Sequence, residues 1–87
     1  MNDHNTILSI VKMGITTDKI MQRFAFKNGY IIIHKIGEIY VLKKNNETIK
    51  MYFDFKNGLY VNGVINTEYQ ANFIECLREV EDEYWGS

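Results

Sequence analysis

Few side chains in this sequence have the type and spacing that catalysis requires. His34 and Glu38 are expected to face each other across a hairpin, where they could form an oriented base, but such cross-strand pairs are common on sheet surfaces. Cys76 falls on the apolar stripe of a predicted helix, where burial keeps a thiol inert. The sequence contains no glycine-rich phosphate loop, nucleophile elbow or zinc-ligand spacing. We therefore expect no enzyme activity, no catalytic residues, no metal and no cofactor.

A cluster of acidic and aromatic residues near the end of the sequence is the first candidate binding surface. Acidic side chains at a helix C-terminus oppose the helix dipole, so helix stability alone does not favour them. They form either a solvated, fraying helix end or a negatively charged surface for the basic groove of a partner protein, with Trp85 as an aromatic anchor. This surface, called the acidic end, consists of Glu79, Glu81, Asp82, Glu83, Tyr84 and Trp85.

One face of a predicted sheet is the second candidate surface. Aliphatic side chains gather at its centre, where an antiparallel sheet with one solvated face should be polar. Either an N-terminal helix or barrel curvature covers this face, or it is an exposed patch that binds a partner or a second copy of the chain. The candidate residues are Ile39, Val41, Lys50, Tyr52, Asp54 and Tyr60.

Nucleic acid is the alternative partner, because Tyr52 and Tyr60 could stack on bases while Lys50 and Arg23 contact phosphates. The charge distribution argues against it. Residues 1–66 contain nine basic and five acidic side chains, a net charge of +4, whereas residues 67–87 contain one basic and six acidic side chains, a net charge of −5. A charge of +4 is low for a dedicated nucleic-acid binder.

These surfaces must be positioned by a small fold. The 87 residues, with 46% hydrophobic and 24% charged residues, indicate a single globular domain over 1–87. A capping box formed by Thr67 and Gln70 predicts a C-terminal helix. Its apolar stripe comprises Tyr69, Phe73, Cys76, Leu77, Val80 and Tyr84. A short N-terminal helix is expected at about 5–13, ending at Gly14.

Between the helices, apolar residues alternate with a period of two, and a Phe-x-Phe-Lys-Asn-Gly sequence occurs twice, at 24–29 and 53–58. Glycines at the ends of three-residue loops predict hairpins. These hairpins pair Phe53 with Val61 and Ile33 with Ile39, and an Asn45-Asn46 turn pairs Leu42 with Ile49. The result is a four- to five-stranded antiparallel meander that can curl towards a small barrel. Its strands are expected at about 20–26, 30–34, 38–44, 48–55 and 59–64. The fold class is α+β.

The segment 17–26 also fits a helix, because Thr17 and Asp18 are good helix starters and Gly29 can end a helix as well as a hairpin. In that case residues 6–24 would have the spacing of a helix-turn-helix. Only five residues precede this segment, too few for the supporting helix of that motif.

The single cysteine and the lack of an N-terminal signal indicate an intracellular, cytoplasmic protein, in the host cytoplasm if a phage encodes it, with no membrane association. We expect a small protein-binding inhibitor or modulator from a phage or other mobile element. Its partner would be a protein such as a nucleic-acid-processing or defence enzyme. A homodimer and a nucleic-acid-binding regulator are the alternatives.

Overall fold

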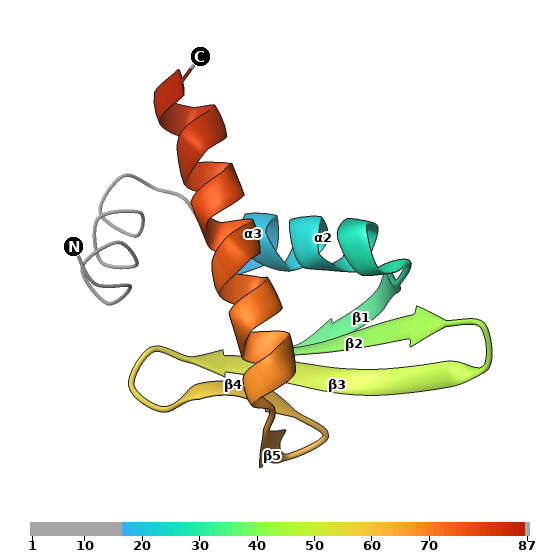
Figure 1. Ribbon diagram of the computed structural model, residues 1–87. Helices are drawn as coiled ribbons and strands as arrows, with labels where there is room; N and C mark the ends of the chain where they lie inside the picture. The colour runs from blue at the N-terminus through green and yellow to red at the C-terminus, as the bar shows by residue number, and fades with distance from the viewer. Residues whose placement is uncertain (1–16, 87) are drawn as a thin grey trace.

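The computed structural model describes the backbone of residues 17–86 and the side chains of residues 17–83. Its five strands form one open antiparallel sheet in the order β1-β2-β3-β4-β5, with a helix before it and a longer helix after it (Figure 1). This confirms the α+β class and the meander. The elements are α2 (Thr17–Asn28), β1 (Ile31–Ile36), β2 (Ile39–Lys44), β3 (Glu47–Asp54), β4 (Gly58–Val61), β5 (Val64–Ile65) and α3 (Thr67–Gly86).

The helix α2 replaces the strand that was expected at 20–26, so the helical alternative is correct. Ile20 and Met21 are buried, and so are Phe24 and Ala25 four residues later. Only a helix places two adjacent pairs with this spacing on one face, because neighbouring residues of a strand point to opposite sides. The predicted helix at 5–13, and the part of the helix-turn-helix before Thr17, lie outside the described residues.

Gly29 ends α2 and does not close a hairpin, as the strand prediction required. Its φ is 78°, its N–H donates to the carbonyl of Phe26 (3.5 Å), and the N–H of Tyr30 donates to the carbonyl of Ala25 (2.8 Å). These two bonds form a Schellman motif, in which glycine adopts the left-handed conformation without steric cost.

The register of the central strands preserves the predicted faces. Leu42 pairs with Ile49, as expected from the Asn45-Asn46 turn. Phe53 pairs with Leu59 instead of Val61, so the β3–β4 hairpin is shifted by two residues from its prediction. A shift of two leaves every side chain on the same face, because side chains alternate with a period of two.

The β1–β2 hairpin differs more. Ile36 pairs with Ile39 across a two-residue turn, and His34 pairs with Val41, so the expected pairing of His34 with Glu38 does not form. A bulge between Ile32 and His34 shifts the register, and Ile32 lies opposite Leu42 on the far side of it. The bulge inserts an extra residue into β1, so the side chains of the part of β1 that precedes the bulge lie on their predicted faces.

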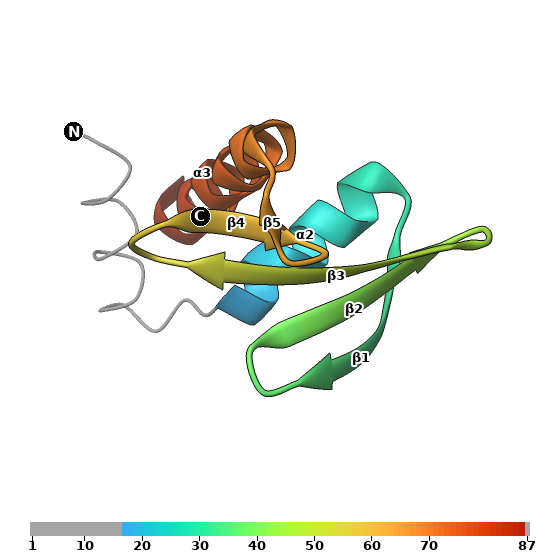
Figure 2. The ribbon, with the colours of Figure 1, turned by 90° about the horizontal axis from the view of Figure 1, so that it is seen from below.

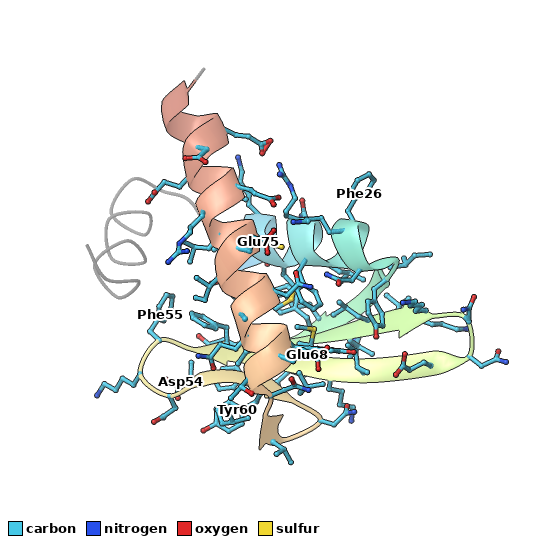
Figure 3. The ribbon with its side chains drawn as sticks, viewed as in Figure 1. Phe26, Asp54, Phe55, Tyr60, Glu68 and Glu75 are labelled. Atoms are coloured by element: carbon cyan, nitrogen blue, oxygen red, sulfur yellow. The ribbon has the colours of Figure 1, made fainter. Side chains whose placement is uncertain are left out.

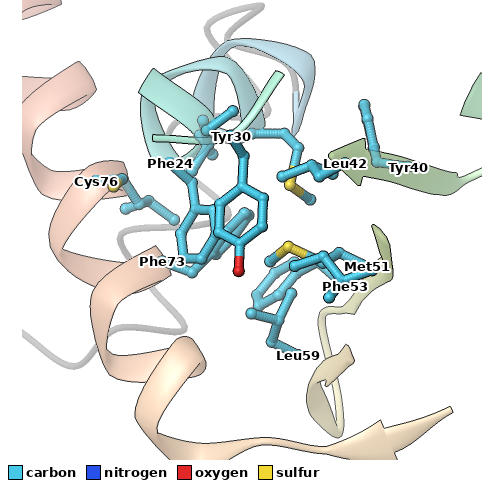
Figure 4. Close-up of a cluster of buried hydrophobic side chains, with 14 of the residues drawn as sticks. Phe24, Tyr30, Tyr40, Leu42, Met51, Phe53, Leu59, Phe73 and Cys76 are labelled. Atoms are coloured by element: carbon cyan, nitrogen blue, oxygen red, sulfur yellow. The ribbon is translucent and has the colours of Figure 1, made fainter. Parts of the chain in front are cut away.

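Both helices pack on the same face of the sheet, which we call the inner face (Figure 2). Phe73 of α3 is central to this packing (Figure 4): its ring stacks on Phe53 of β3 at 4.7 Å and lies 6.5 Å from Phe24 of α2. The buried core comprises Ile20, Met21, Phe24, Ala25, Tyr30, Tyr40, Leu42, Ile49, Met51, Phe53, Leu59, Phe73, Cys76, Leu77 and Val80.

The start of α3 is anchored to the sheet. Asn66, and not Thr67, caps the helix, because its side chain accepts a hydrogen bond from the N–H of Tyr69 (2.9 Å). Gln70, expected to complete the capping box, instead accepts a hydrogen bond from the N–H of Leu59 (3.2 Å). Gly58 adjoins this contact with a φ of 122°, and a Cβ there would collide with the Gln70 side chain.

Replacing Phe73 by alanine tests the role of the aromatic cluster. We expect Phe73→Ala to lower the free energy of unfolding by about 3–5 kcal/mol, because it leaves a cavity between both helices and the sheet. The matched control is Phe26→Ala, since Phe26 is 85% exposed on α2 and its loss should change stability by less than about 0.5 kcal/mol. Urea denaturation measures both. Equal effects of the two substitutions would contradict the described core.

Candidate functional site

The side of the sheet turned away from α2 and α3 is not covered by any element that the structure describes (Figure 2). We call it the outer face. In Figure 3, Tyr60 and Asp54 lie on this side of the sheet, whereas Phe26 points away from α2 on the opposite side of the molecule. The predicted residues Ile39, Val41, Lys50, Tyr52, Asp54 and Tyr60 all belong to the outer face, as their strand positions require.

Apolar and aromatic side chains cross the outer face in one line. Tyr52 pairs with Tyr60, Tyr60 with Ile65, and Ile36 with Ile39. Ile39 lies beside Tyr52, because the adjacent residues Tyr40 and Met51 are paired. The line thus takes one residue from each of the five strands, and we call it the cross-strand row: Ile36, Ile39, Tyr52, Tyr60 and Ile65.

The cross-strand row is accessible. The rings of Tyr52 and Tyr60 lie 5.9 Å apart, and Ile36 is 59% exposed. A shallow hollow of about 300 Å³ opens on the row, and it is lined by Ile39, Lys50, Tyr52, Tyr60, Asn62 and Gly63. Partial burial raises the pKa of the Tyr52 phenol, and the charges of Asp54 and Glu38 raise it further. The phenol therefore remains a neutral hydrogen-bond donor at physiological pH.

Two of the predicted outer-face residues have structural roles. Val41 is 9% exposed, so its side chain packs beneath the surface of the outer face. The Asp54 carboxylate accepts hydrogen bonds from the N–H of Lys56 (2.8 Å) and from the side chain of Asn57 (3.0 Å). These bonds lower the pKa of Asp54 and hold the β3–β4 loop in place.

The acidic end is partly occupied by contacts within the chain. Arg23 of α2 forms ion pairs with Glu79 (3.2 Å) and Glu83, and Lys27 forms ion pairs with Glu75 (3.3 Å) and Glu79. The two cations lower the pKa of the Glu79 carboxyl, with Lys27 as the larger cause.

The rest of the acidic end differs from Glu79 and Glu83. Asp82 is exposed and Glu81 is half-buried, and neither forms an ion pair with another residue of the described chain. The backbone of Tyr84 and Trp85 continues α3, and their side chains are outside the described set. The structure therefore separates the acidic end into two carboxylates that pair with α2 and two that form no ion pair within the described residues.

Sequence reasoning missed two members of the row and misplaced one cation. Ile36 was assigned to a loop because the turn at Gly37-Glu38 is shorter than expected. Ile65 was left beyond the last strand because the strand expected at 59–64 is divided into β4 and β5 by a turn at Asn62-Gly63. An Asn-Gly pair typically forms a two-residue hairpin turn, so the second turn could have been found. Arg23 was placed beside the tyrosines but lies on α2, in the layer on the other side of the sheet.

Three further observations concern metal-ligand groups, membrane-spanning helices and similarity to known proteins. Within residues 17–86, histidine, cysteine, aspartate and glutamate side chains form no group of three that could hold a metal ion. Neither α2 nor α3 is long and apolar enough to cross a membrane. No protein-family model, curated protein or solved structure matches this chain.

The ion pairs between α2 and α3 predict a pH-dependent stability. The double substitution Arg23→Gln and Lys27→Gln should lower the melting temperature at pH 7. The pKa of Glu79 is depressed in the folded state, so its contribution is complete above its ordinary value of 4.5 and is lost as the pH falls through the lower folded value. Melting curves should therefore differ at pH 7 and converge near about pH 3. An equal difference at both values would show that the pairs do not stabilise the fold.

Proposed function

We propose that this protein binds another protein through its outer face and so modulates that partner. The observation that supports the proposal is the cross-strand row, in which two half-buried tyrosines and three exposed isoleucines lie side by side across the sheet. Soluble monomers rarely expose contiguous apolar patches without a function, and aromatic side chains are enriched at the centres of protein interfaces.

The composition of the outer face favours a protein over a nucleic acid. Phosphate recognition needs cations around the stacking rings, but the charged groups that raise the pKa of Tyr52 are the carboxylates of Asp54 and Glu38. Arg23 and Lys27, two of the three cations of α2, are already paired with carboxylates of α3. The tyrosine rings therefore form the centre of a mixed, largely apolar patch, which is typical of a protein interface.

The acidic end is a weaker candidate for the docking surface. Two of its four carboxylates, Glu79 and Glu83, are engaged with Arg23, and this pairing reduces the negative potential that a basic partner would meet. Glu81 and Asp82 carry the remaining charge of this surface, outside the ion pairs with α2. Their contribution is tested with the double variant Glu81→Gln and Asp82→Asn in the experiment below.

Affinity capture with matched variants tests the proposal. The wild-type protein is used as bait in an extract of the cell that carries its gene, and the affinity for the captured protein is then measured after purification. Tyr52→Ala and Tyr60→Ala should each weaken binding by roughly tenfold or more, because each removes a central aromatic contact. The control Phe26→Ala removes a ring that is 85% exposed on the opposite side of the molecule and should leave the affinity unchanged.

Three outcomes would overturn the proposal. Unchanged binding by both tyrosine variants would exclude the outer face. A loss confined to the Glu81→Gln and Asp82→Asn variant would assign docking to the acidic end. Salt-sensitive binding of single-stranded oligonucleotides that is lost with Tyr52→Ala would identify a nucleic-acid platform, because phosphate contacts give a steep dependence on salt concentration.

A further inference from the structure

The charged side chains of the outer face are sorted by sign along the strands. Glu38, in the turn between Ile36 and Ile39, and Asp54, at the end of β3, lie at one end of the face by their positions in the register, and both charges raise the pKa of Tyr52. Lys43 lies near the other end, opposite Thr48, and Lys50 lies between Lys43 and the cross-strand row. Glu47 and Lys44 do not disturb this order, because both contact Tyr30 on the inner face.

Lys56 is a cation at the negatively charged end of the outer face. It follows Asp54 in the β3–β4 loop, and its charge is the smallest of the causes that lower the pKa of Asp54. With Glu38 and Asp54 it leaves a net charge of −1 at this end, against the two positive charges of Lys43 and Lys50. The face is thus negative at one end, apolar in the middle and positive at the other end.

Such a face is complementary to itself in one orientation. In this orientation the two copies are related by a two-fold axis that lies in the plane of the interface. The axis runs across the strands, between the cross-strand row and the Val41–Lys50 pair, so the strands of the second copy run in the opposite direction. Glu38 and Asp54 of one copy then lie over Lys43 of the other. The tyrosines of the row lie over the second copy's Lys50, where an ammonium group can contact the ring face.

The other face-to-face arrangement is disfavoured. A two-fold axis parallel to the strands keeps their direction, so the positive ends of the two copies lie over each other, and so do the negative ends. Like charges in an interface repel and suppress the wrong partner or register. The sorting of the charges therefore selects a second copy in the antiparallel orientation, because a two-fold dimer satisfies each opposite-charge contact twice.

We infer that a second copy of this chain occupies the outer face in that orientation when no other partner is bound. The inference rests on the proposed function, since both use the same surface, and it adds that self-association and partner binding exclude each other. The outer face is four inter-strand spacings of about 4.8 Å wide and about six residues long, at about 3.3 Å per residue. Its area is therefore roughly 400 Å². A standard interface buries about 800 Å² per partner, so we expect a dimer that dissociates on dilution.

A charge-swap experiment tests the dimer. Molar mass is measured by light scattering and by sedimentation over a concentration series, for the wild type, Lys43→Glu, Glu38→Lys and the double variant. Both positions are exposed, and melting curves confirm that each variant folds. Each single swap should raise the dimer Kd by roughly tenfold, because it creates a like-charge contact twice per dimer. The double variant exchanges the signs of the contact between positions 38 and 43 and should recover part of the lost affinity, because Asp54 still lies over the new carboxylate at position 43.

The outcomes separate this inference from the proposed function. A wild-type protein that stays monomeric at every concentration, or a double variant that recovers none of the lost affinity, overturns the antiparallel dimer. If the tyrosine variants still lose the captured partner in that case, the proposed function stands without the dimer. If dimerisation follows the charge swaps while the tyrosine variants keep full partner affinity, the outer face serves self-association and the proposed function fails.

Discussion

The packing of the Phe73 ring between Phe53 and Phe24 is the contact on which the rest of the structure depends. It joins α3 to the sheet and to α2 in one cluster, so both helices must lie on the same side. A sheet that is covered twice on one face needs no further layer to bury its core, and no element within residues 17–86 covers the other face. The architecture and the candidate site thus have the same cause.

The alternation of side chains was enough to predict the faces of β2, β3 and β4, because errors of two residues leave them unchanged. The β3–β4 hairpin shows this, since Phe53 lies opposite Leu59 and not Val61, yet the face of each residue is as predicted. The helix at 17–28 was harder to identify. Ile20 and Phe24 are four residues apart, a spacing that fits both a strand and a helix, and the burial of Met21 and Ala25 distinguishes the two.

The candidate site was predictable only in part, for a related reason. Tyr52 and Tyr60 lie inside strands and follow the alternation, whereas Ile65 lies next to a turn, where one residue more or less decides whether it belongs to the sheet. The role of Glu79 could not be predicted at all. Its partner Arg23 is 56 positions away in the sequence, and their contact depends on how two helices cross, which no local pattern records.

The bulge at Ile33 has a consequence for how this protein can grow into larger assemblies. An open sheet has two edges, and a long, regular edge strand can recruit further chains without limit until fibres form. Here β5 is only two residues long, and the bulge divides β1 into shorter regular segments. Neither edge offers a continuous template, so the geometry disfavours fibrillar stacking while it leaves the broad side of the sheet available for a contact that closes after two chains.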